Sequence, residues 1–85
     1  MSNPKNELYQ AIANEAKASG VELSCSQILL LAAALTLRAE AFAADDIEAA
    51  VEYRNAARKR AGEMELSDES AARLLDIQIE PWENH

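Results

Sequence analysis

Few residues in this sequence have the type and spacing that catalysis needs. Hydrolysis or group transfer requires a base oriented next to a nucleophile, or paired carboxylates in a cleft. The single histidine is His85, the last residue of the sequence, where a chain end tends to fray. We therefore expect no catalytic residue, and we expect that the protein is not an enzyme.

The single cysteine, Cys25, falls in the first turn of an expected helix, a position that can lower the pKa of a thiol. Its neighbours Ser24, Ser26 and Gln27 include no base, so we expect a buried or half-buried structural cysteine. A single cysteine cannot form an internal disulfide. The sequence also lacks the basic segment followed by an apolar stretch that is typical of a signal peptide, so we expect none. Both features predict a cytoplasmic location.

Carboxylates cluster in residues 45–48 and again at Glu63 and Glu65. Neither cluster has the spacing or the glycine of a calcium-binding loop, and no Cys/His pattern indicates zinc. The two glycines stand 42 residues apart, so they form no phosphate-binding loop. We expect no metal and no cofactor.

The element that organises the chain is an apolar helix over residues 25–43. Ser24 and Gln27 have the spacing of a capping box, and Leu23 and Ile28 have that of a hydrophobic staple. Residues 28–37 are uncharged and mostly apolar, so we expect a helix that is buried on every side. This uncharged run is too short to cross a bilayer.

Three further helices are predicted. The first begins with Asn3 as its cap and ends at Gly20. The next starts near Asp45 or Asp46 and ends at Gly62, and nothing in residues 39–44 forbids one long helix, although we favour a break. The last begins after Ser67 and ends by about Ile79, because Pro81 excludes helical geometry from the residue before it.

The predicted fold is all-α: one domain over residues 1–80, a compact bundle of three or four short helices with the helix 25–43 buried at its centre, and a short tail over 81–85. Hydrophobic residues make up 49% of the chain, but many are alanine, so the core of a single copy is thin. We expect a homodimer or higher homo-oligomer, with contacts at Leu29, Leu30, Leu31 and Leu35.

The charge of the chain is concentrated near its C-terminus. Residues 63–85 carry seven acidic side chains against Arg73 alone, within a chain of net charge −7. Such a surface favours a basic protein partner, although it also serves simply to keep a small protein soluble. Trp82 in the tail either covers the core or anchors a partner. The predicted partner-binding residues are Trp82, Glu63, Glu65, Asp68, Glu69, Asp76 and Glu80.

The leading hypothesis is a small, non-catalytic interaction protein, a regulator or inhibitor of bacterial or phage type. One variant is an inhibitor that mimics DNA with its carboxylates. An alternative is a DNA-binding regulator that uses the basic residues Arg54, Arg58, Lys59 and Arg60. The acidic chain and the cation-poor central helix make nucleic acid an unfavoured partner. A structural helical assembly unit is a third possibility.

Overall fold

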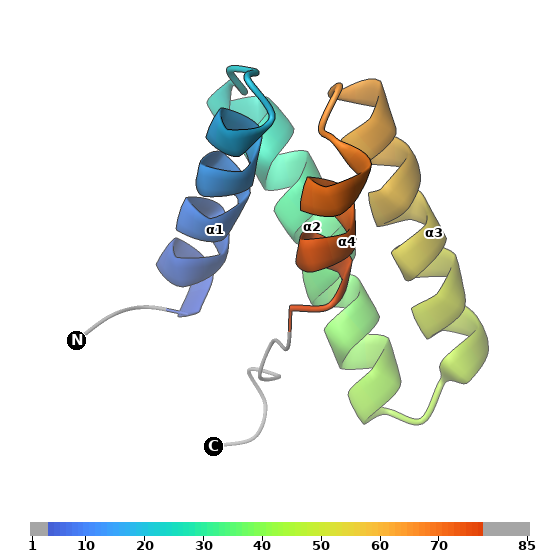
Figure 1. Cartoon of the computed structure of the whole chain (residues 1–85). Helices are drawn as coiled ribbons and strands as arrows, with labels where there is room; N and C mark the ends of the chain where they lie inside the picture. Colours follow the sequence, from blue (N-terminus) through green and yellow to red (C-terminus); the bar gives the residue numbers. More distant parts are fainter. Residues whose placement is uncertain (1–3, 78–85) are drawn as a thin grey trace.

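Four helices form the fold in a computed structural model that describes residues 4–77: α1 (Pro4–Ala18), α2 (Cys25–Ala43), α3 (Ile47–Glu63) and α4 (Asp68–Leu75). The described residues contain no strand, so the predicted all-α class is confirmed. Helices α2 and α3 form a hairpin, and the short α4 packs against α1 and α3 (Figure 1). The predicted tail over 81–85 lies outside the described residues.

Helix α2 begins and ends where the sequence predicts. Ser24 Oγ accepts a hydrogen bond from the backbone N–H of Gln27 at 3.2 Å, and Gln27 Oε1 accepts one from the N–H of Ser24 at 2.8 Å. These two bonds form the predicted capping box. The break before α3 is also confirmed, and Asp46 caps α3 by accepting from the N–H of Ala49 at 3.1 Å.

Three helices end in the same type of turn, with one residue in the left-handed conformation. That residue is Gly20 after α1 (φ 77°), Asp45 after α2 (φ 60°) and Glu65 after α3 (φ 64°). In each turn the next residue donates its N–H to a carbonyl five residues earlier, at distances of 2.9–3.1 Å. This is the hydrogen bond of a Schellman stop. Two of the three stops therefore use a residue with a Cβ atom, which disfavours the left-handed conformation.

The prediction that Gly62 ends the third helix is wrong. Gly62 lies within the last turn of α3, and the left-handed residue is Glu65, three positions later. The later stop places Leu66 in the core, where it is 7% exposed. Burial of a leucine thus decides where the helix ends, in place of the glycine.

Helix α2 is the central helix, but it is not buried on every side as expected. Leu31 and Leu35 are 1% and 0% exposed, whereas Leu29, Leu30 and Leu37 are 51%, 48% and 40% exposed. The reason lies in the packing: α1 and α3 cover one side of α2, and α4 packs mainly on those two helices. Over its full 19 residues α2 is long and apolar enough to cross a membrane, a test that core helices of soluble proteins also pass.

Helix α4 ends at Leu75, earlier than the predicted end near Ile79. Arg54 Nη1 donates to the carbonyl of Leu75 at 2.9 Å, and Arg38 Nη2 donates to that of Ile77 at 2.7 Å. A longer helix would need the Leu75 carbonyl for its own next turn. The two arginines therefore stabilise the early end of α4.

Candidate functional site

The exposed side of α2 is the first candidate interaction surface. It consists of Leu29, Leu30, Ala33 and Leu37, which we call the leucine face, and all four are exposed. These residues recur every three or four positions, so they lie on one side of the helix. No charged residue interrupts α2 before Arg38. The leucine face is thus a continuous apolar strip in contact with solvent.

A hollow of about 370 Å³ adjoins the leucine face between α1 and α2. Its walls include Tyr9 from α1 and Ala33 and Leu37 from α2. The small side chain of Ala33 leaves room there for an apolar side chain of another molecule. Strip and hollow together have the form of a surface on which a second helix can pack.

The structure corrects the predicted set of self-association residues. Leu31 and Leu35 belong to the core of the single chain, at 1% and 0% exposed, so a second copy cannot reach them. Leu29 and Leu30 remain accessible, at 51% and 48% exposed. Leu37, at 40% exposed, joins them although the sequence did not single it out.

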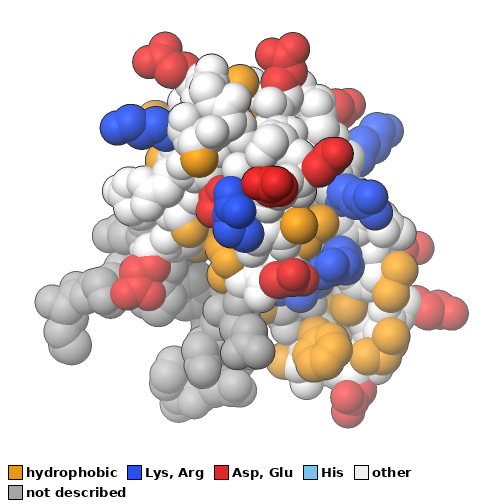
Figure 2. Space-filling view, viewed as in Figure 1, with side chains coloured by type: hydrophobic (Ala, Val, Ile, Leu, Met, Phe, Trp, Pro, Cys, Tyr) orange, Lys and Arg blue, Asp and Glu red, His pale blue; other side chains and the backbone are white. Residues whose placement is uncertain are grey.

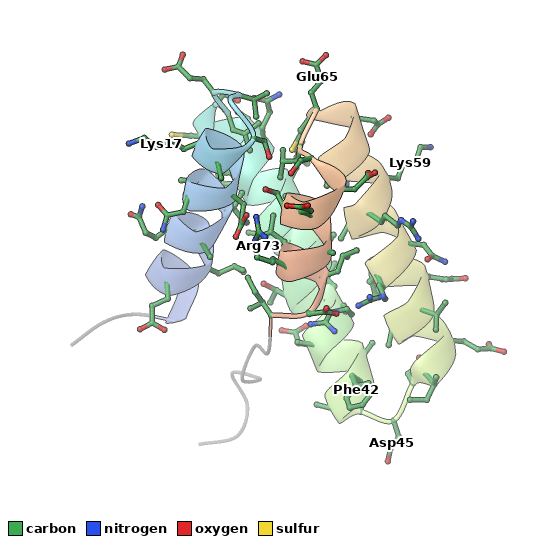
Figure 3. The ribbon with its side chains drawn as sticks, in the orientation of Figure 1. Lys17, Phe42, Asp45, Lys59, Glu65 and Arg73 are labelled. Atoms are coloured by element: carbon green, nitrogen blue, oxygen red, sulfur yellow. The ribbon has the colours of Figure 1, made fainter. Side chains whose placement is uncertain are left out.

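The predicted acidic surface is only partly brought together. Four exposed carboxylates gather at the turn between α3 and α4, and we call this group the acidic surface: Glu63, Glu65, Asp68 and Glu69. Glu65 points into solvent at this end of the molecule (Figure 3). Asp76 lies at the opposite end of α4, 3.5 Å from Arg54. Glu80 and Trp82 lie outside the described residues.

The four predicted basic residues do not form one patch. Arg54 is engaged with the Leu75 carbonyl and with Asp76, whereas Arg58 and Lys59 are exposed and Arg60 is half-buried. Arg54 and Arg58 share one side of α3, as predicted, and both line a groove of about 520 Å³ between α3 and α4. Lys59 points away from this groove (Figure 3).

A second apolar patch lies at the turn between α2 and α3. Phe42, Ile47 and Val51 are 65%, 53% and 50% exposed. Figure 2 shows hydrophobic side chains gathered over this end of the hairpin, beside basic side chains. The sequence reasoning did not identify this patch, although Ile47 and Val51 stand at helical spacing.

A polar cluster that the sequence did not reveal joins α4 to the end of α1. Ser70, 0% exposed, donates from Oγ to the carbonyl of Glu15 at 3.3 Å. Ser19 Oγ accepts from the N–H of Ser67 at 3.0 Å, and Arg73 binds the Glu15 carboxylate. The hydrogen bond from Arg73 is the main cause that lowers the pKa of Glu15. The arrangement joins α4 to α1 through side-chain hydrogen bonds and one ion pair.

Cys25 is exposed, so the prediction of a buried or half-buried cysteine is wrong. It lies at the first position of α2, where the capping turn holds it clear of the core. Within residues 4–77 no group of His, Cys, Asp or Glu side chains could hold a metal ion. Of the carboxylates in residues 45–48, that of Asp46 caps α3, and Glu48 lies in the first turn of the helix.

No protein-family model, no curated protein and no solved structure matches this chain.

Proposed function

We propose that this protein is a small, non-catalytic interaction protein that pairs with a second copy of itself and binds a basic partner protein. The leucine face carries the first part of this proposal. The acidic surface at the turn between α3 and α4 carries the second. A regulator or inhibitor with a cytoplasmic partner is the concrete form that we favour.

In a single copy, the leucine face exposes apolar side chains whose burial would be favourable. Full burial of a leucine contributes about 1.5–3 kcal/mol relative to exposure. Leu29, Leu30 and Leu37 each keep roughly half of their surface in water, at 51%, 48% and 40% exposed. Pairing with a second copy would bury these side chains, at the usual cost of association.

The order of residues on the leucine face suits a two-fold axis. Leu29 and Leu30 precede Ala33 by about one helical turn, and Leu37 follows it by one turn. When two such helices cross antiparallel at Ala33, the leucines before it lie opposite Leu37 of the second copy. This arrangement is self-complementary, as a symmetric dimer requires.

The acidic surface remains accessible in such a dimer, because its four carboxylates lie on the turn between α3 and α4 and in the first turn of α4. Exposed carboxylates of one sign attract basic surfaces and accelerate association at low salt. They also repel nucleic acid, which disfavours the DNA-binding alternative.

A capture experiment tests partner binding. The chain is immobilised through its N-terminus beside a variant with lysine at Glu63, Glu65, Asp68 and Glu69, and both are exposed to a bacterial lysate. A matched control also carries four lysines, at Glu22, Asp45, Glu48 and Glu52, which are exposed carboxylates elsewhere on the molecule. We expect a basic protein that binds the natural chain and the control, elutes with salt and is lost from the first variant.

Equal retention by all three chains would contradict the role of the acidic surface. Retention of duplex DNA by the natural chain at low salt would favour the DNA-binding alternative.

A further inference from the structure

A groove whose chemistry is opposite to that of the acidic surface runs along α3 and α4. It consists of the 520 Å³ hollow beside Arg58 and a second hollow of about 340 Å³ beside Arg38 and Phe42. Arg54 and Leu75 line both hollows, so the two adjoin each other. We call this feature the arginine groove.

One side of α3 borders the arginine groove, and Arg54 and Arg58 on this side line its hollows. Ile47, Val51, Arg54 and Arg58 follow each other at intervals of four, three and four residues, so they share a side of the helix. The two apolar residues stand at the end near Phe42, and the two arginines stand farther along. This side of α3 therefore changes from apolar to basic over about three helical turns, or roughly 16 Å.

The hydrogen-bond donors of the arginines beside the groove are only partly satisfied within the described residues. Arg38 Nε is buried and has no acceptor among the described residues. Burial, followed by the nearby charge of Arg54, lowers the pKa of Arg38, and the charge of Asp76 partly offsets this effect. Arg58 is exposed and makes no hydrogen bond that joins it to another described residue.

The charges that line the groove are unequal. Three arginines line it against two carboxylates, Asp68 and Asp76, and Asp76 already lies 3.5 Å from Arg54. The groove is thus locally basic within a chain of net charge −7. Its walls combine these cations with the exposed ring of Phe42 and the apolar side chains of Leu66 and Leu75.

We propose that the arginine groove binds an acidic, amphipathic segment of another protein. Carboxylates of that segment would pair with Arg58 and with the Arg38–Arg54 pair. Its apolar side chains would cover Phe42 and Val51. This site is separate from the leucine face and shares only Asp68 with the acidic surface, and it does not depend on the function proposed for them.

A synthetic probe tests this proposal directly. The probe is a peptide of about twelve residues with leucine and glutamate at helical spacing, long enough as a helix to span the groove. A second peptide carries glutamine in place of each glutamate. Each is titrated into the isotopically labelled full chain, and amide chemical shifts are followed by NMR. We expect saturable shifts at Phe42, Val51, Arg58 and Leu75 with the first peptide and much weaker binding of the second.

Matched variants separate specific contacts from general attraction. Arg58→Gln should weaken binding of the glutamate peptide about two- to fivefold, the range for one exposed ion pair. Lys59→Gln removes the same charge outside the groove and should leave binding unchanged. Phe42→Ala should weaken binding, whereas Leu30→Ala, on the leucine face, should not.

Three results would overturn the proposal. The first is the absence of localised shifts, and the second is an equal loss in the Arg58 and Lys59 variants. The third is movement of the groove resonances when the chain alone is concentrated, because a second copy would then be the occupant.

Discussion

Arg73 and Glu15 form a bidentate ion pair that joins α4 to α1. Arg73 Nε lies 3.0 Å from each carboxylate oxygen of Glu15, and Nη2 lies 2.9 Å from Oε1. The pair lies beside the buried Ser70, whose hydroxyl bonds the Glu15 carbonyl. Helix α4 has only eight residues, so these polar contacts complement the small apolar surface that it buries.

The ion pair predicts a defined pH dependence of stability. The hydrogen bond from Arg73 lowers the pKa of Glu15 below its ordinary value of 4.5 in the folded chain. Its stabilisation is therefore fully present above the pKa of the unfolded chain and is lost as the pH falls through the lower folded pKa. Glu15→Gln should reduce the free energy of unfolding at pH 7, and this deficit should shrink as the pH falls below 4.5.

Urea unfolding of both chains across this pH range measures the effect. Glu22→Gln, at an exposed carboxylate, is the matched control and should show no such trend. A deficit of constant size at every pH would show that the charge of Glu15 is not what Arg73 recognises.

The two glycines should respond in opposite directions to the same substitution. Gly20 has a φ of +77°, so Gly20→Ala should cost about 1 kcal/mol of stability. Gly62 lies in α3, and the methyl group of an alanine there would meet no neighbouring side chain within 4 Å, so Gly62→Ala should add about 0.5–1 kcal/mol. Thermal unfolding of the two variants checks both signs, and a loss of stability at Gly62 would refute the described end of α3.

Replacement of Asp45 or Glu65 by glycine should increase the stability of the chain. Both residues adopt the left-handed conformation, with φ of 60° and 64°. Glycine adopts this conformation without the strain of a Cβ atom, so Asp45→Gly and Glu65→Gly should each add about 0.5–1 kcal/mol. Glu48→Gly, inside α3, is the control and should destabilise the chain. Destabilisation by both turn variants would contradict the two stops.

Ser24 should contribute measurably as the cap of α2. Ser24→Ala removes the acceptor of the Gln27 N–H and should cost about 1 kcal/mol. In a domain of this size such a loss lowers the melting temperature by several degrees. Ser26→Ala, at an exposed position two residues later, is the control and should have little effect. An unchanged melting temperature for Ser24→Ala would mean that the capping box adds no stability.

The features that the sequence predicts well are local ones. The caps at Ser24 and Ser67 and the stop at Gly20 each depend on residues within one or two turns, so their spacing alone predicts them. The stop at Glu65 escaped prediction because it depends on where Leu66 reaches the core. The Ser19–Ser67 contact joins residues 48 positions apart and leaves no local pattern.

The interaction surfaces also combine features that the local sequence predicts with features that depend on how the helices pack. The apolar run predicts that α2 packs against other elements. Which side of α2 stays exposed depends on how α1, α3 and α4 pack. Leu31 and Leu35 therefore could not be distinguished from Leu29 and Leu30 by their type. The arginine groove likewise exists only after α4 is placed beside α3.

The mass of the protein in solution tests whether the chain self-associates through the leucine face. Light scattering is measured between about 1 and 100 µM, the range suited to a small apolar interface. Leu30→Asp combined with Leu37→Asp places two charges on the leucine face, and Ile47→Asp combined with Val51→Asp is the matched control, with two charges at similarly exposed positions on α3. We expect a mass of at least twice the 9.3 kDa of the chain for the natural protein and the control, and the mass of a monomer for the variant with aspartate at Leu30 and Leu37. A monomer of 9.3 kDa for the natural protein across this range would contradict this expectation.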